Sequence, residues 1–244
     1  MRHANHLTIA ADRSLYLGVL PATGWHAHAT PVLLVGLSGP FAVHLAPGRV
    51  EICRSALVDQ GVPHVFDPRG EQVALVYLEP DAPEALALRA LLRREGGVVF
   101  EPVRRSAARQ ADHARLRSFD LAALLRWRLG EVPPLDARVA HSLRQLRSGS
   151  AGPWRRDDAA RGVGLSASRF NHLFAQEVGV SFRSYRVWAQ VRRAMTGLGP
   201  RLNLTEAALE GAFSDSSHFS RTFRQTFGMT PSSVLKPLQH VEVL

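Results

Sequence analysis

Short hydrogen-bonding side chains and long cations gather on one face of the segment 217–228 of this 244-residue chain. In a helix, Ser217, Ser220, Arg221 and Arg224 would all point to the same side. A guanidinium can hold both hydrogen-bond acceptors of guanine, and a serine hydroxyl can donate to a base edge or accept from it. Groups of these types on one helical face are suited to reading base edges in a groove of DNA.

The other face of this segment carries the aromatic residues that would hold such a helix in place. Phe219, Phe223 and Phe227 recur at every fourth position, which aligns them along one side of a helix. Ala212 and Phe213, just upstream, can close a small core against them. The pattern therefore predicts a helix with one buried and one exposed face.

Capping residues mark the ends of this helix and of the one before it. Ser214 or Asp215 can cap its first turn, and Gly228 can adopt the left-handed conformation that ends it. Asn203, with an acidic residue three positions later, predicts the start of a helix over 204–211. Two short helices joined by a tight turn form a helix-turn-helix.

The pattern of 217–228 occurs a first time at 168–179, at a constant offset of 49 residues (217 minus 168). The two copies share Ser, both Phe, Gln and Gly, and a repeat at a fixed offset indicates duplicated structure. The inward positions of the first copy are Phe170, Leu173 and Phe174. Its outward positions are Ser168, Asn171 and His172, which correspond by the offset to Ser217, Ser220 and Arg221.

The segment 181–198 between the copies is helical in pattern, with large apolar residues about every third position. At about 1.5 Å per residue this helix would be about 27 Å long. Successive major-groove faces of a duplex lie about 34 Å apart, so such a connector could place two recognition helices in adjacent turns.

The two motifs, above all GAFSDSSHFSRTFRQTFGMTP, resemble the AraC/XylS family of bacterial transcription regulators over about residues 136–236. The chain departs from the family at Ala212, where glycine is usual, and at Val234 and Leu235, where a Tyr-Arg pair is usual. In the family, outward residues of both recognition helices contact bases. The resemblance implies that role here for Ser168, Asn171, His172, Ser217, Ser220 and Arg221.

Cations near these motifs would contact phosphates, which supply affinity without sequence information. We assign this role to Arg169, Arg192, Arg193 and Arg224. The formal charge is −1 over residues 1–80, +3 over 81–135 and +7 over 136–244, which together give the net charge of +9. The positive charge therefore lies mainly where the motifs are, as expected for a partner rich in phosphate.

Short apolar runs broken by Gly and Pro between residues 14 and 79 predict the strands of a sandwich or barrel. The stretch GWHAHATPVLLVGLSGP, followed by GVPHVF, resembles the cupin-type sensor domain that often precedes this DNA-binding region. His26, His28 and His64 then have two alternative roles: they line an effector pocket, or they bind a divalent transition metal. His44 could join them, although a surface or pocket role is more common for a single histidine. Metal-binding cupins usually add a carboxylate, which is missing after this histidine pair.

Residues 81–94 and 119–129 have the leucine spacing of amphipathic helices, which would form a dimer interface, relay a signal or simply cover the barrel. Residues 104–117 form a basic segment, which we interpret as a solvated helix face without a partner. Pro133 and Pro134 mark the boundary between two domains, at 1–132 and 133–244. Asp136 would cap the first helix of the second domain, over 137–147, and residues 148–153 would close it.

Cys53 is the only cysteine, which excludes an intrachain disulfide and fits a reducing cytoplasmic compartment. No apolar stretch approaches the length of a membrane span, so we expect no membrane partner. The spacing supports neither a catalytic nucleophile arrangement nor a glycine-rich phosphate loop, so an enzyme is not predicted.

The sequence thus predicts an α+β chain: an N-terminal cupin-like β-barrel (jelly roll) with helices, then an all-α domain whose two helix-turn-helix motifs are joined by a long helix. The predicted function is a sequence-specific regulator that binds double-stranded DNA and responds to a small effector. RNA polymerase and a second copy of the chain are further candidate partners. The alternative is a cupin-type metalloprotein with metal-dependent sensing or enzymatic activity.

Overall fold

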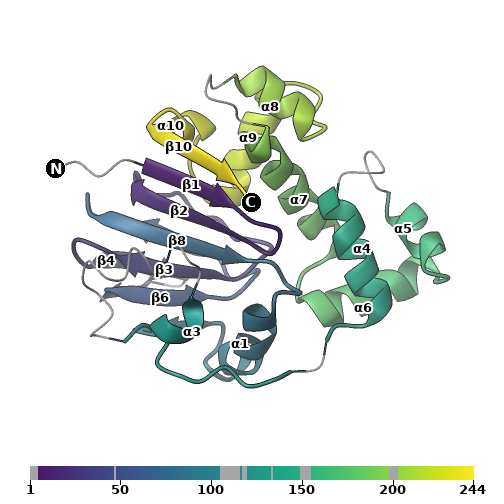
Figure 1. The fold of residues 1–244 in the computed structure, drawn as a ribbon, viewed down its shortest axis with the longest axis horizontal. Coiled ribbons are helices and arrows are strands. Elements are labelled where there is room, and N and C mark those ends of the chain that lie inside the picture. The colour runs from purple at the N-terminus through teal and green to yellow at the C-terminus, as the bar shows by residue number, and fades with distance from the viewer. Residues whose placement is uncertain are drawn as a thin grey trace. The chain divides into compact units, whose positions relative to one another are not determined.

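The computed structural model describes residues 5–46, 48–104, 116, 120–132, 134–148, 155–197 and 203–244. Two compact units emerge (Figure 1): Met1–Val132 together with Arg224–Leu244, and Pro133–Phe223. The first is rich in strands and the second is helical, so the chain is of the mixed α+β class. Most of the basic segment 104–117 and most of the closing segment 148–153 lie outside the described residues.

The larger sheet of the first unit has seven strands in the order β10-β1-β2-β8-β3-β6-β9. Its strands are β1 (Asn5–Ile9), β2 (Arg13–Val19), β3 (Val32–Gly36), β6 (Ser55–Val58), β8 (Gln72–Leu78), β9 (Val98–Phe100) and β10 (Leu238–Val243). The central strands β3 and β8 are buried on both faces, which explains their continuous apolar sequence.

A second sheet has three strands in the order β5-β4-β7, formed by β4 (Phe41–Leu45), β5 (Arg49–Cys53) and β7 (His64–Asp67). The strand-like runs recognised in the sequence are present as β2, β3, β4, β6 and β8. Within the described residues they form two separate sheets, and a closed barrel is not found.

Helix α1 (Pro83–Arg94) agrees with the helix predicted over 81–94, and it buries Ala85, Leu88 and Leu92 in the core of the larger sheet. The helix predicted over 119–129 is wrong for most of its length, because α3 (Leu121–Leu124) is a single turn. The chain is extended at Leu125, which pairs with Val103 and is fully buried. The leucines of this segment pack into the core of the larger sheet and do not form one face of a long helix.

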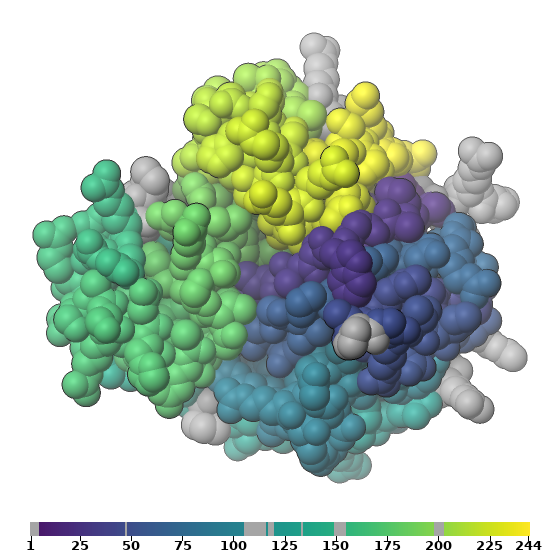
Figure 2. All heavy atoms as spheres, turned by 180° about the vertical axis from the view of Figure 1, so that it is seen from behind, coloured from purple at the N-terminus to yellow at the C-terminus, as the bar shows by residue number. Residues whose placement is uncertain are grey.

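Strand β10 was not expected from the sequence, which assigned the C-terminal residues to the DNA-binding domain. It pairs in parallel with β1, with Leu7 opposite Val241 and Ile9 opposite Val243. Figures 1 and 2 both show this yellow C-terminal segment lying beside the purple N-terminal strand. The last residues of the chain therefore complete the sheet of the first unit.

The second unit consists of helices α4 (Ala137–Ser148), α5 (Arg156–Gly162), α6 (Ala167–Val178), α7 (Phe182–Thr196) and α8 (Leu204–Glu210), and of α9 (Ser216–Phe227) up to Phe223. Helix α10 (Pro231–Leu235) belongs to the first unit. Helix α7 has 15 residues, so it is about 22 Å long, shorter than predicted. None of the described helices is both long enough and apolar enough to cross a bilayer.

Candidate nucleic-acid interface and histidine cluster

Helices α6 and α9 repeat each other in length and position. Each has 12 residues, and both ends of α9 lie 49 positions after the ends of α6 (216 minus 167, 227 minus 178). Each is preceded by a seven-residue helix, α5 or α8. The offset found in the sequence is therefore also the offset between α6 and α9, and α8 follows α5 at nearly the same distance, 48 positions (204 minus 156).

Side chains and glycines define the ends of these helices, and for α9 they are the residues that the sequence predicted, Asp215 and Gly228. The carboxylate of Asp215 accepts a 2.7 Å hydrogen bond from the backbone N–H of His218, and so caps α9. The hydroxyl of Ser166 caps α6. Gly179 and Gly228, directly after the two helices, adopt the left-handed conformation with φ values of 90° and 69°.

The inner faces of the two helices are aromatic. Phe170 and Phe174 on α6 and Phe219 and Phe223 on α9 each have at most 1% of their surface exposed. In the first copy, the Phe170 ring lies 5.1 Å from that of Phe182. These contacts hold each helix by one side, which leaves its opposite side for a ligand. The predicted inward residue Leu173 is only half-buried.

The outer faces carry the predicted base-contacting residues. Ser168, His172, Ser217 and Arg221 are exposed, and Asn171 and Ser220 are half-buried. All six side chains therefore reach the surface, three from each helix. The side chains differ in reach, since the serines are short and Arg221 is long.

The four arginines assigned to phosphates differ in exposure. Arg169 and Arg224 are exposed. The guanidinium of Arg193 donates a 2.7 Å hydrogen bond from Nε to the carbonyl oxygen of Glu210, at the C-terminus of α8. Arg192 is buried, with 8% of its surface exposed, because it lies one turn after Trp188 on the inner face of α7. This burial disfavours a contact between Arg192 and a phosphate, so we leave Arg192 out of the phosphate contacts proposed below.

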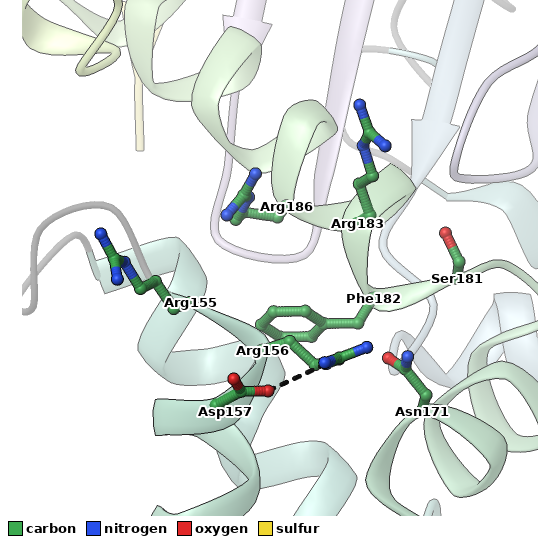
Figure 3. A pocket seen from close by; sticks show the side chains of 8 residues that line it. All are labelled: Arg155, Arg156, Asp157, Asn171, Ser181, Phe182, Arg183 and Arg186. Atoms are coloured by element: carbon green, nitrogen blue, oxygen red, sulfur yellow. Dashed lines mark hydrogen bonds and ion pairs between the residues drawn. The ribbon is translucent and has the colours of Figure 1, made fainter. Parts of the chain in front are cut away.

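An arginine-lined cleft of about 510 Å³ opens between α5, α6 and the start of α7. Figure 3 shows its side chains; they are Arg155, Arg156, Asp157, Asn171, Ser181, Phe182, Arg183 and Arg186. One carboxylate is present beside four guanidinium groups, and it pairs with Arg156 at 3.0 Å. The cleft is thus suited to an anion, and it includes the predicted base-contacting residue Asn171.

These four arginines were not predicted from the sequence as a group. The excess of positive charge over 136–244 was the available signal, but it does not say which cations converge. Arg155 and Arg156 stand at the start of α5, whereas Arg183 and Arg186 belong to α7. Only the packing of these helices brings them to one cleft.

Three histidines of the first unit form a compact cluster. His26 and His28 lie on the loop between β2 and β3, and His64 begins β7. Their ring centroids are 4.4 to 5.1 Å apart, and one ring nitrogen of each lies within 4.8 Å of those of the others. His28 also packs edge-on against Tyr77 of β8, at 5.0 Å. His44 is half-buried on β4 and does not belong to the cluster.

Burial keeps these imidazoles neutral. It lowers the pKa of His26 to about 4, with a further contribution from the neighbouring His64. Burial also lowers the pKa of His28, assisted by the other two histidines, and that of His64. Both nitrogens of His28 and Nε2 of His64 are buried without a hydrogen-bond partner among the described residues. Neutral imidazole is the form in which histidine binds a metal.

Comparison with known proteins identifies the C-terminal region. Residues 159–237 match a family model described as "Helix-turn-helix domain". The transcriptional regulator ExsA of Pseudomonas aeruginosa is 32% identical over 83 residues, which are 32% of this chain and 29% of that protein. The arabinose operon regulatory protein of Escherichia coli is 31% identical over 102 residues, which are 41% of this chain and 35% of that protein. The chain thus spans about a third of the length of these curated relatives.

The fold of the chain resembles that of ToxT from Vibrio cholerae. One ToxT structure aligns with 93% of this chain and 98% of its own, with a TM-score of 0.61 and 12% identity. At this identity the likeness concerns the fold alone. The sequence matches concern the C-terminal region: residues 159–237 match the helix-turn-helix model, and this region is similar to regulators such as ExsA and the arabinose operon regulatory protein.

Proposed function

We propose that this protein is a sequence-specific, DNA-binding transcription regulator, with α6 and α9 as the recognition helices of two helix-turn-helix motifs. The observation that carries the proposal is the repeat itself. Two equivalent helices, 49 positions apart, are each held by a phenylalanine face and present a polar outer face, within the region that matches the helix-turn-helix family. A repeated reader of this kind engages two neighbouring stretches of a duplex.

Arg221 is the strongest candidate for reading a base. Its exposed guanidinium can hold the O6 and N7 acceptors of guanine together, which discriminates against a wrong base by about 1 to 3 kcal/mol. Asn171 can pair with adenine in the same two-pronged way. Ser168, Ser217, Ser220 and His172 contribute single hydrogen bonds or permit close approach.

The arginine-lined cleft supports a phosphate contact beside α6. Four guanidinium groups around one opening attract the duplex backbone, and Arg groups match phosphate geometry with paired hydrogen bonds. Because Asn171 lines the same cleft, a phosphate held there would orient this residue toward a base. Arg169, Arg193 and Arg224 complete the proposed phosphate contacts.

Helix α7 connects the two motifs, since it contacts both α6 and α8. At about 22 Å it is shorter than the 34 Å or so between successive major-groove faces. The helices packed at its two ends therefore have to supply the rest of the spacing between α6 and α9.

For the first unit we propose a cupin-like sensor of a small molecule. The resemblance to ToxT supports this proposal, because one ToxT structure is described as bound to an unsaturated fatty acid. A homodimer and contact with RNA polymerase are further elements of the proposal, in keeping with the regulators that the chain resembles. We favour regulation over enzymatic activity because the matched relatives are transcription regulators.

Selection of duplexes from a randomised pool tests the proposal. The purified chain should enrich a defined sequence, and its affinity should fall with salt by a slope of about −0.9 for each phosphate contacted. Absence of an enriched sequence would rule out sequence-specific reading. Affinity independent of salt would rule out the phosphate contacts.

A further inference from the structure

The histidine cluster has the hydrogen-bonding pattern of metal ligands. The Nδ1 atoms of His26 and His64 lie 2.9 Å from the carbonyl oxygens of Gly24 and Val62, respectively. A carbonyl oxygen only accepts, so both Nδ1 atoms carry the proton and both Nε2 atoms keep a lone pair. In metal sites the second ring nitrogen of a ligating histidine is commonly bonded to a backbone carbonyl in this way.

The burial of the third histidine, His28, also supports metal binding. His28 has 3% of its surface exposed, and neither of its nitrogens has a hydrogen-bond partner among the described residues. An unsatisfied buried polar atom costs roughly 1 to 3 kcal/mol, so a native structure rarely keeps several together. A cation shared by the three rings would satisfy one nitrogen on each of them.

We propose that His26, His28 and His64 bind one divalent transition-metal ion, and that this ion orders the segment in which α9 ends. An all-imidazole set suits zinc, copper, nickel and iron better than calcium or magnesium. Zinc is the first choice, because three protein ligands complete a tetrahedral site with one water or effector atom. Among the described residues no carboxylate joins the cluster, so the fourth ligand comes from outside this set.

Contacts within the first unit connect the cluster to the end of α9. The ring of Phe227, the last residue of α9, lies 5.9 Å from that of His28 and 5.7 Å from that of Tyr77. Gly228 follows, and its carbonyl oxygen accepts a 2.7 Å hydrogen bond from the N–H of Gly24. Gly24 in turn accepts from His26. Fixing the three rings on an ion therefore restrains both contacts of residues 227 and 228.

The regulatory meaning of this coupling rests on the proposed function, in which α9 reads DNA. The same helix begins at Ser216 in the second unit and ends at Phe227 in the first. A metal that orders the end of α9 would therefore couple metal binding to the conformation of one proposed recognition helix. Metal binding and ordering of the segment can both be measured without DNA, so their failure is distinguishable from failure of the DNA-binding proposal.

The first experiment measures binding of the metal alone. Full-length protein is freed of metal with a chelator and titrated with Co²⁺, whose visible absorption reports imidazole ligands, and then with Zn²⁺ in competition. We expect one ion per chain, and binding about tenfold or more weaker in His28→Ala and His64→Ala. His44→Ala is the control, because His44 lies on the neighbouring strand β4 outside the cluster.

Folding of each variant is checked by circular dichroism. If a variant fails to fold, the titration of the wild-type protein still tests whether the metal site exists. A wild-type protein that binds no stoichiometric Co²⁺ or Zn²⁺ would overturn the metal site. Equal loss of binding in His44→Ala would also overturn it, since the ligands would then lie elsewhere.

The second experiment measures the coupling by hydrogen exchange with and without Zn²⁺, in the absence of DNA. We expect the amides of residues 224–232 to exchange more slowly with Zn²⁺ in the wild type, and this effect to be lost in His28→Ala. Binding of Zn²⁺ with unchanged exchange over 224–232 would refute the coupling and leave the metal site standing.

Discussion

The backbone N–H of Gly24 donates a 2.7 Å hydrogen bond to the carbonyl oxygen of Gly228, 204 positions later in the chain (228 minus 24). Gly24 precedes the first cluster histidine, and Gly228 follows the last residue of α9. This single bond joins the loop of the histidine cluster to the end of α9, the proposed second recognition helix.

Gly228→Ala should destabilise the protein for two reasons. The left-handed φ of 69° costs a residue with a Cβ atom about 1 to 2 kcal/mol. A Cβ atom would also stand 2.9 Å from both the nitrogen of Gly24 and Nδ1 of His26, which is too close. The midpoint of urea unfolding, followed by circular dichroism, measures the effect.

Gly164→Ala is the matched control for this prediction. Gly164 has the same φ of 69°, but an added Cβ atom would meet nothing within 4 Å. Gly164→Ala should therefore lose only the free energy that the left-handed backbone costs an alanine. Gly228→Ala should unfold at a lower urea concentration than Gly164→Ala. Equal midpoints would mean that the junction at Gly24 tolerates a methyl group.

Arg221→Ala should lose preference for the operator while the fold stays intact, because Arg221 is exposed. Loss of one two-pronged guanine contact corresponds to about 1 to 3 kcal/mol of discrimination. Fluorescence anisotropy with selected and scrambled duplexes measures the ratio of affinities. Arg144→Ala removes an exposed cation from α4 and should leave that ratio unchanged. An unaltered ratio in a folded Arg221→Ala protein would remove Arg221 from the base-reading set.

Arg183→Ala should weaken binding to selected and scrambled duplexes alike, because a phosphate contact carries no sequence information. The slope of log affinity against log salt should become shallower by about 1. Arg183 is exposed at the mouth of the arginine-lined cleft. Arg138→Ala is the control, because it removes an exposed cation of α4 that pairs with Asp136 and lies outside the cleft. It should leave the slope unchanged. If both variants kept the parental slope, the cleft would not contact the duplex backbone.

Phe219→Ala should destabilise the second motif by about 3 to 5 kcal/mol, since it removes a fully buried ring from the core. The Phe219 ring lies 5.3 Å from the ring of Phe213 and 5.8 Å from that of Phe223, so the substitution removes ring contacts with both. Leu209→Ala on α8 is the control, because Leu209 is 66% exposed. The melting temperature of Phe219→Ala should be clearly lower than that of Leu209→Ala. Similar melting temperatures would contradict the buried role of Phe219.

The helical motifs could be predicted from the sequence because their determinants lie within a few residues of each other. The Asp215 cap, the glycines after α6 and α9, and the four-residue spacing of phenylalanines are local features, and a repeat doubles the evidence. The same local reading failed over 119–129, where the pattern of leucines fits a helix. There, the chain is extended at Leu125, because this conformation buries the leucine against the sheet.

What the sequence determined by itself was the pair of repeated helices with their aromatic inner faces and outward polar residues, and two short motifs that together carry three histidines. Only the tertiary structure decided which distant groups meet: β10 beside β1, four arginines around one cleft, His64 beside His26 and His28, and Gly228 against Gly24. Caps and periodicity act over a few residues and are visible in any short window. Pairings between remote segments depend on how whole sheets and helices pack, and no local pattern encodes them.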